Sequence, residues 1–300
     1  MNIGIDLGGS HIGVGLIDKG TVVSKREMDI NINEIDIKEF IVRNICNFIN
    51  EILKEKALDI ENIEFIGIST PGVAKNNVIY NMVNLGINEF KIAEMINQTF
   101  PKNIKLKNDA KCAAIAEFKY GCMKDYSDGI FLTMGTGIGG AAFINNRLIQ
   151  SNTFPGTEFG HMVIQKDGKK CKCGNYGCFE TYGAMKVLKQ EIKNQYNLED
   201  DISSKEIIDI IKDDIEKEKM SKIIDGYVSY LALGIANLIN IFEPEVIGLG
   251  GSIVYIGDII TKKLENEIIQ KNLLFNKRNT INIQIATLGN DAGMIGAANL

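Results

Sequence analysis

The sequence predicts a two-domain α/β fold, and three observations support this prediction. The chain has 300 residues, which is about twice the length of a typical single domain. Strand-like and helix-like patterns alternate along it. Finally, GGSHIGVGLI at residues 8–17 resembles GTGIGGAAFI at residues 135–144, and each places a glycine-rich turn between two strands. We therefore expect two related α/β domains with a cleft between them, one of residues 1–108 plus 287–300 and one of residues 109–286.

The first third of the chain predicts a strand pair followed by alternating helices and strands. The pair surrounds the turn at residues 8–10, and a later strand stops at the turn Thr70-Pro71-Gly72. Apolar residues at helical spacing mark the first and longest helix. The expected strands are 3–7, 12–17, 65–69 and 104–107, and the expected helices are 37–56, 92–98 and 110–120.

The rest of the chain predicts a second set of strands and several helices. Strands at 130–134 and 141–144 flank the second glycine turn, and a strand at 246–249 enters Gly250-Gly251. The charged segment 200–222 carries an apolar stripe of isoleucines, which predicts one amphipathic helix with a solvated face. An apolar helix is expected at 223–241, and residues 286–300 are expected to form a strand and a small helix that pack on the first domain.

Composition excludes several classes of function. The chain is 45% hydrophobic and 24% charged, with a net charge of −5, so it is ordinary globular material without the basic patches that bind nucleic acid. No export signal precedes the first strand, and the longest apolar stretch, residues 230–242, is shorter than the roughly 20 residues that span a bilayer. We expect a cytoplasmic protein.

A cluster of metal-binding residue types is the most specific local signal. Three of the six cysteines are Cys171, Cys173 and Cys178, and His161 lies ten residues before them. In a cytosolic chain this spacing favours a metal over a disulfide, and one His with three Cys fills the tetrahedral sphere of Zn²⁺. With no open position, the zinc is expected to be structural and to hold the loop 161–180.

Three glycine-rich bends that each follow a strand predict a phosphate site, because glycine lets backbone N–H groups approach closely. No Walker sequence is present, and a strand follows the second bend where a dinucleotide site needs a helix. Asp6 precedes the first bend, where it suits Mg²⁺ or the common role of a turn cap. Asp109 begins a helix, where it suits an N-cap or, in a kinase, a general base. Glu158 and Glu180 flank the cysteine cluster, where they suit sugar hydroxyls or a charged surface.

Taken together, the motifs resemble the ROK family of bacterial sugar kinases and sugar-responsive repressors. They occur in the family's order along nearly the whole chain: DLGGS, STPG, VNLG, NDA, GTGIGG, EFGHM, CKCGNYGCFE, GLGG and LGNDAGMIGAA. The resemblance implies the actin-like (ribonuclease H-like) fold of two α/β domains. It also implies ATP-dependent phosphorylation of a hexose at its 6-hydroxyl, with bacterial glucokinases as the most similar members, and a homodimer.

The resemblance also implies roles for individual residues. Asp109 would deprotonate the sugar hydroxyl, and His161 would bind both zinc and sugar. The other implied sugar ligands are Asn84, Asn108, Glu158 and Glu180. The residues implied around ATP and its Mg²⁺ are Asp6, Gly8, Gly9, Ser10, Thr136, Gly137, Gly250 and Gly251.

Two departures from the family pattern and three alternatives remain at this point. Ser10-His11 stands where the family usually has Thr-Lys, and Val73 stands where N-acetylmannosamine kinases often have Arg, which favours glucose. The chain alternatively phosphorylates an N-acetylhexosamine or fructose, or it is a sugar sensor without catalysis. A repressor would need a DNA-binding domain before Asp6, where we expect no room for one.

Overall fold

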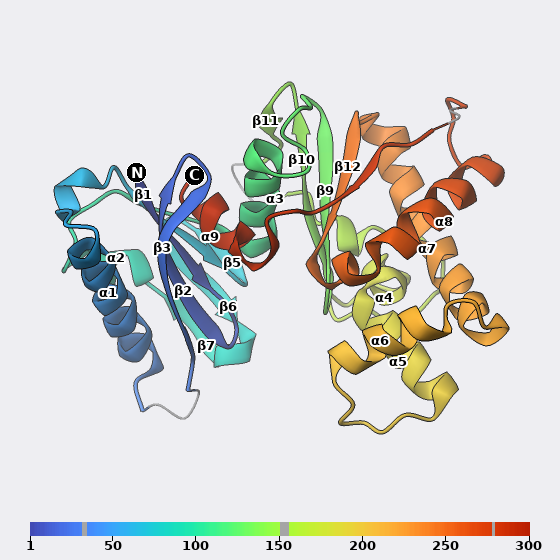
Figure 1. The fold of residues 1–300 in the computed structure, drawn as a ribbon, viewed down its shortest axis with the longest axis horizontal. Helices are drawn as coiled ribbons and strands as arrows, with labels where there is room; N and C mark the ends of the chain where they lie inside the picture. Colours follow the sequence, from blue (N-terminus) through green and yellow to red (C-terminus); the bar gives the residue numbers. More distant parts are fainter. Residues whose placement is uncertain (32–34, 151–155, 278–279) are drawn as a thin grey trace. The chain divides into compact units, whose positions relative to one another are not determined.

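The computed structural model describes residues 1–31, 35–150, 156–277 and 280–300. Its contacts form two compact units, Met1–Gly121 with Leu288–Leu300, and Cys122–Thr287 (Figure 1). The helix α3 (Asp109–Tyr120) belongs to the first unit because it packs against α9 (Ala292–Ala297) and the edge of the first sheet. The division of contacts thus comes after α3, whereas the boundary expected from the sequence preceded it.

The first unit contains a five-stranded sheet in the order β3-β2-β1-β4-β8. The strands are β1 (Asn2–Leu7), β2 (His11–Asp18), β3 (Thr21–Asp29), β4 (Ile66–Thr70) and β8 (Ile104–Asn108). β1, β2 and β3 pair antiparallel, whereas β1, β4 and β8 run parallel. The carboxyl ends of three parallel strands therefore lie at one edge. A smaller antiparallel sheet follows β4 and contains β5 (Val73–Lys75), β6 (Val78–Met82) and β7 (Ile87–Phe90).

Alternation along β1 decides which helix covers each face of this sheet. Ile3 and Ile5 are fully buried in a core that also includes the apolar stripe of α1 (Ile37–Glu55). Gly4 faces α9, where a Cβ atom would collide with the backbone of Met294. α1 and the short helix α2 (Ile92–Asn97) thus lie on one side of the sheet and α9 on the other (Figure 1).

The second unit repeats this topology. Its sheet has the order β11-β10-β9-β12-β13, with antiparallel pairing of β9, β10 and β11 and parallel pairing of β9, β12 and β13. The strands are β9 (Gly129–Met134), β10 (Ile138–Ile144), β11 (Arg147–Leu148), β12 (Val246–Gly250) and β13 (Ile283–Ile285). The sequence repeat is therefore a repeat of the fold, and the predicted α/β class with duplicated glycine-turn hairpins is confirmed.

The helices of the second unit correct one prediction. A single helix over 200–222 is wrong, because α6 (Ser204–Asp214) ends where Lys217 closes a turn. The Lys217 backbone N–H donates to the Asp214 carbonyl at 2.8 Å, and its ammonium pairs with the Asp214 carboxylate at 2.7 Å. The next helix, α7 (Glu218–Phe242), starts directly after that turn. The sequence analysis did not predict α4 (Glu180–Gly183), α5 (Met185–Tyr196) or α8 (Gly257–Gln270).

α7 is long and apolar enough to cross a membrane by length and composition, contrary to the estimate from the sequence. Within the described residues it is the one helix that meets this test, and 56% of its most apolar window is buried inside the protein. It packs against α4, α5 and α8, and its buried side chains belong to the main core of the second unit. These contacts account for its apolar character.

Candidate active site and metal centre

The parallel edge of the first sheet brings polar side chains from two neighbouring strands together. Asp6 lies near the end of β1 and Ser69 is its register partner on β4. The Ser69 hydroxyl donates to Asp6 Oδ1 at 2.7 Å, although Ser69 is fully buried. Ligands of open α/β sheets bind outside the carboxyl ends of parallel strands. A cavity of about 550 Å³ opens here, lined by Asp6, His11, Gly13, Glu27, Met28, Asp29, Asn290 and Met294.

Asn108 and Asp109 follow at the end of β8, and the structure divides their roles. Asn108 is the N-cap of α3, because its Oδ1 accepts from the Ala110 N–H at 3.1 Å. Its Nδ2 donates to the Gly72 carbonyl at 3.4 Å. Asp109 is the first residue of α3, so the N-cap position that the sequence suggested for Asp109 is occupied by Asn108.

Asp109 has an unusual environment for a carboxylate. Burial raises its pKa, the hydrogen bond from the Ala110 N–H, at 2.7 Å, opposes that rise, and the negative charge of Asp6 adds to it. A carboxyl group whose pKa is raised toward neutrality is better suited to accept a proton than an ordinary aspartate is.

Two side chains lie against the first glycine turn. A Cβ atom at Gly8 would collide with the His11 ring, and one at Gly9 would lie 2.6 Å from Asn84 Nδ2. The His11 ring also reaches Asp6, with Nε2 3.4 Å from Oδ2, and this hydrogen bond raises the pKa of His11. Asn84 lies on the short helix η2 (Val83–Leu85). A side chain at either glycine would displace His11 or Asn84 from the turn.

The second glycine turn faces a different neighbour. The Glu180 carboxylate accepts from the Ile138 N–H at 3.0 Å, and a Cβ atom at Gly137 would collide with that carboxylate. At Gly135, by contrast, a Cβ atom would meet no atom within 4 Å. Gly251 has a φ of 78° and packs against the Met134 backbone beside the turn. The second and third glycine bends therefore lie together at the carboxyl ends of β9 and β12.

The predicted zinc ligands are brought together by the backbone of their loop. Cys178 pairs with Val163 across an antiparallel bridge, and Gly174 and Gly177 supply the positive φ angles that turn the chain between the cysteines. The four ligand atoms of His161, Cys171, Cys173 and Cys178 all lie within 4.8 Å of one another.

The spacing of these ligand atoms fits zinc. Cys173 Sγ lies 3.7 Å from Cys178 Sγ, and His161 Nδ1 lies 3.7 Å from Cys171 Sγ. A tetrahedron with Zn–S distances of about 2.3 Å has sulfur–sulfur edges of about 3.8 Å. Because Nδ1 faces the cluster, the opposite ring nitrogen of His161 is left for another partner.

The comparison with known proteins identifies the family. The model of the ROK family matches residues 2–300. This chain belongs to the ROK family. It is 28% identical over 310 residues to a glucokinase of Halalkalibacterium halodurans, covering 98% of this chain and 92% of that protein. It is 27% identical over 302 residues to the xylose repressor of Bacillus spizizenii, covering 100% of this chain and 76% of the repressor. Among solved structures, the ROK hexokinase of Thermus thermophilus superposes with a TM-score of 0.82 at 25% identity, covering 99% and 97% of the two chains.

Within this ROK chain, the predicted site residues fall into two sets. The first unit holds Asp6, Gly8, Gly9, Ser10, Asn84, Asn108 and Asp109. The second unit holds Thr136, Gly137, Glu158, His161, Glu180, Gly250, Gly251 and the three cysteines. Glu158 immediately precedes the short helix η3 (Phe159–His161), and His161 is its last residue. A hydrogen bond from the Phe179 N–H to the Met162 carbonyl, at 2.8 Å, connects the end of η3 to the start of α4.

Sequence reasoning missed Ser69, Glu27 and Asp29 as neighbours of Asp6. Ser69 was predicted only as the last residue of a strand. In the structure, exposed and half-buried positions alternate along β3 and place Glu27 and Asp29 on one face, but the residue types of this strand do not alternate and gave no signal.

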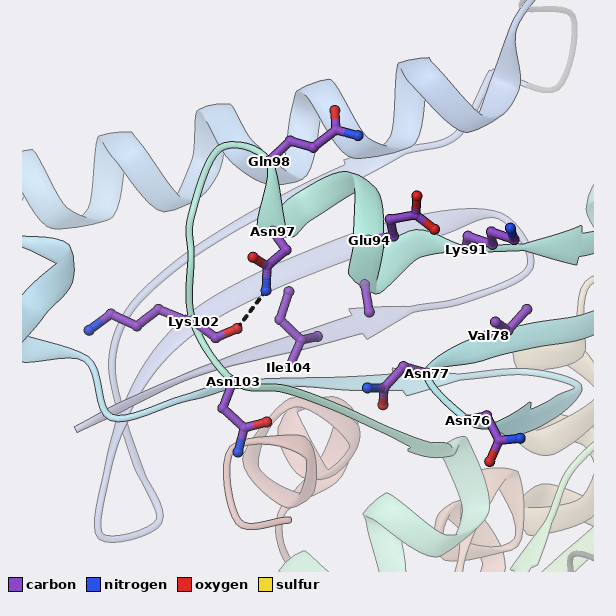
Figure 2. A pocket seen from close by; sticks show the side chains of 11 residues that line it. Asn76, Asn77, Val78, Lys91, Glu94, Asn97, Gln98, Lys102, Asn103 and Ile104 are labelled. Carbon is purple, nitrogen blue, oxygen red and sulfur yellow. Dashed lines mark hydrogen bonds between the residues drawn. The ribbon is translucent and has the colours of Figure 1, made fainter.

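A larger cavity of about 590 Å³ in the first unit contains none of the predicted residues (Figure 2). Amide side chains dominate its lining, and Asn97 is tied to the Lys102 carbonyl by a hydrogen bond of 2.9 Å. In this ROK protein, cavity size alone therefore does not mark the candidate site.

Proposed function

We propose that this ROK protein transfers the γ-phosphoryl group of ATP to the 6-hydroxyl of a hexose, most simply glucose. One observation carries the proposal. The pKa of the Asp109 carboxylate is raised by desolvation and by the negative charge of Asp6, although the residue is exposed at the end of β8, and Asn108 holds the capping position of α3. Family membership and the similarity to a glucokinase support the same activity.

In this proposal Asp109 accepts the proton of the attacking hydroxyl. The carboxylate is attached to the first turn of α3, so its position is fixed by the helix and by the Asn108 cap. Partial desolvation raises its pKa, which makes the carboxylate a stronger base than an ordinary aspartate. Its ionised form is required, since a protonated carboxyl group has no capacity to take the proton.

The glycine turns and Asp6 would serve the nucleotide. Open space at Gly135 and the tight backbone at Gly251 suit phosphate oxygens, which need backbone N–H groups without intervening side chains. Mg²⁺, when bound with ATP, neutralises charge on the β- and γ-phosphates. Asp6, oriented by Ser69, is the carboxylate suited to hold that ion.

The zinc loop would present sugar ligands without taking part in phosphoryl transfer. Zinc bound to His161 Nδ1 would leave the other ring nitrogen for a sugar hydroxyl. The backbone hydrogen bond that connects η3 to the start of α4 would hold Glu158 and Glu180 at a fixed separation. Because every position of the tetrahedron is filled by the protein, the metal supplies rigidity and no activated water.

Glucose is favoured over the alternatives by Val73, which lacks the charge that the resemblance associates with N-acetylmannosamine kinases. Phosphorylation of an N-acetylhexosamine or fructose would use the same groups. Similarity to xylose repressors supports a third possibility, sugar binding without catalysis. The cytoplasmic location and homodimer that the resemblance implies belong to this proposal.

The test is Asp109→Asn, which keeps the size of the side chain and removes the base. Loss of a general base lowers turnover by about a hundred- to ten-thousandfold. We expect ADP release in single-turnover experiments to fall by this amount, while glucose affinity measured by calorimetry changes less than threefold.

Asp258→Asn is the matched control, because Asp258 also lies in the first turn of a helix but far along the chain in α8. It should turn over like the wild type. Undiminished turnover of Asp109→Asn would remove Asp109 from the mechanism. A wild type that binds glucose but releases no ADP would instead support the non-catalytic alternative.

A further inference from the structure

A third cavity lies in the second unit, and none of the residues assigned above lines it. It has a volume of about 420 Å³ and is formed by α4, α5, the first half of α7 and the zinc loop. Its size is within the range of about 300–1,000 Å³ that small-molecule sites occupy. The residues that line it are Lys169, Tyr182, Val187, Leu188, Glu191, Gln195, Lys219, Lys222, Ile223, Gly226, Tyr227 and Tyr230.

The floor of this cavity is aromatic and aliphatic. Tyr182 and Tyr230 form a pair with ring centroids 4.5 Å apart and an interplanar angle of 31°. The hydroxyl of Tyr182 accepts from the Lys169 N–H at 2.7 Å, and that of the buried Tyr227 donates to the Gly183 carbonyl at 2.7 Å. Tyr182 and Tyr227 are therefore fixed in place and buried, and the half-buried Tyr230 is the tyrosine of the three with ring surface left for apolar contact.

The rim carries an excess of positive charge in a chain whose net charge is −5. Three lysines and one glutamate line it, and the glutamate, Glu191, already accepts a hydrogen bond from Gln195 at 3.0 Å. The ammonium of Lys169 lies 5.0 Å from the centroid of the Tyr182 ring, and among the described residues it forms no ion pair. Lys219 lies 4.7 Å from the centroid of the Tyr196 ring, and its ammonium also donates to the Gln195 carbonyl. Lys222 is paired with the Glu218 carboxylate at 2.6 Å, so Lys169 and Lys219 supply the positive charge of the rim. Cations held over aromatic rings remain able to meet an anion.

A glycine inside α7 supplies an independent observation. Glycine in a helix interior costs about 1 kcal/mol relative to alanine, so it needs a reason. Gly234 has one, because a Cβ atom there would lie 2.5 Å from the Phe179 ring. Gly226, two helical turns earlier, is exposed, and a Cβ atom there would meet nothing within 4 Å. It lines the cavity, and its missing side chain keeps that space open.

From the tyrosine floor, the lysine rim and the open glycine, we propose that this cavity is a binding site for a small organic anion with an aromatic body. The ring would lie against Tyr230 over Gly226, and the anionic group would meet Lys169 and Lys219. The site is independent of the proposed kinase activity, because no residue that lines it has a role there. Such a ligand would contact α4, the same short helix that begins with Glu180.

Binding is tested with the full chain and two named probes. Anilinonaphthalene sulfonate, an aromatic anion whose fluorescence rises in apolar surroundings, reports on occupancy. Indole-3-propionate should displace it, and the neutral indole-3-propionamide should compete at least tenfold less well because it lacks the charge that the lysines meet. We expect one probe per folded chain, with affinity that falls as salt is added.

Gly226→Met fills the cavity without strain, because the new side chain enters open space and suits a helix. It should weaken probe binding at least tenfold. Gly226→Ala is the matched control: it makes the same gain in helix propensity, leaves most of the space and should change affinity less than twofold.

A second pair of variants tests the charge. Lys169→Gln combined with Lys219→Gln should weaken indole-3-propionate about tenfold and leave indole-3-propionamide unchanged. Lys271→Gln, which removes a lysine of the i,i+4 pair with Glu267 on α8, is the control.

Three results would overturn the proposal. The first is that the acid and the amide compete equally well for the probe site. The second is that Gly226→Met and Gly226→Ala bind the probe with equal affinity. The third is that the wild type binds no probe and that Gly226→Met changes the oligomeric state measured by sedimentation. The last result would show that the cavity is covered by a second copy of the chain.

Discussion

The two glycine-turn hairpins share a backbone and differ in the side chains around it. β1 and β2 enclose Gly8-Gly9-Ser10, β9 and β10 enclose Gly135-Thr136-Gly137, and each first strand pairs in parallel with the next strand of its sheet. In the first, Asp6 stands opposite Ser69. In the second, the equivalent position is Thr133, opposite Gly250. A carboxylate within the strand and a histidine therefore lie at one turn, whereas the equivalent strand position at the other turn is neutral and its one carboxylate, Glu180, comes from α4.

This difference indicates a division of labour. Duplication supplies two turns of the same shape, and the chemistry of each depends on a few side chains beside it. The first turn has the carboxylate suited to a cation, whereas the second has exposed space for phosphate oxygens and one carboxylate, Glu180, that closes its far side.

Removal of zinc should have the largest effect and should act on one unit only. The cluster closes a loop in the second unit, and structural zinc sites contribute several kcal/mol to folding. A zinc chelator should lower the stability of the second unit by more than about 3 kcal/mol and leave the first unit unchanged. Hydrogen exchange resolved by segment measures both. Equal loosening of the two units, or of neither, would contradict the assignment.

Exchange of the equivalent residues tests the comparison directly. Asp6→Asn should lower kcat/KM for ATP about a hundredfold and raise the Mg²⁺ concentration needed for half-maximal rate, since a carboxylate ligand is lost. Thr133→Val, of nearly the same size, should change kcat/KM less than threefold. Steady-state kinetics over a Mg²⁺ series measures this. Similar losses in both variants would remove the distinction between the turns.

Two glycines of the second turn should respond differently to alanine. Gly137→Ala displaces the Glu180 carboxylate, breaks its hydrogen bond from the Ile138 N–H and should destabilise the protein by about 1 kcal/mol. Gly135→Ala enters open space and should change stability by less than about 0.5 kcal/mol. Because that space is proposed for phosphate, Gly135→Ala should still raise KM for ATP. Chemical denaturation and kinetics separate the two effects, and equal loss of stability would refute the geometry.

The smallest effect concerns Asp109 and pH. Its pKa is raised in the folded state by burial, so its favourable contribution to stability is present below its ordinary pKa and is lost as pH rises through the raised value. Asp109→Asn should therefore be slightly more stable than the wild type at pH 8 and similar to it at pH 4. The wild-type rate should fall as pH decreases through the raised pKa. Thermal melts and a pH–rate profile measure these trends, and a less stable Asp109→Asn at pH 8 would contradict them.

Local pattern was enough to predict the elements that carry both turns. Buried apolar runs beside glycine gave β1, β2, β9, β10 and β12, because a strand buried on both faces leaves a continuous signal. The zinc cluster was predictable because its four ligands lie within 18 residues, so the fold had little freedom to separate them.

Other features depend on contacts that sequence spacing does not encode. Ser69 supports Asp6 only because β1 and β4 are neighbours in the sheet. The choice of Asn108 over Asp109 as helix cap is a matter of one residue of register. The break between α6 and α7 interrupts a continuous stripe of isoleucines, because a local hydrogen bond and ion pair of Lys217 with Asp214 end the first helix.

The central claim is that this ROK chain phosphorylates a hexose, and ADP release with ATP and Mg²⁺ tests it most directly. The sugars to compare are glucose, N-acetylmannosamine, N-acetylglucosamine, mannose, fructose and allose. The account predicts release that depends on sugar, is highest with glucose and is absent in Asp109→Asn. ADP release only with an N-acetylated sugar would show that the substrate is an N-acetylhexosamine and would leave the proposed mechanism unchanged. No release with any sugar, from folded and zinc-loaded protein that still binds glucose, would contradict the account.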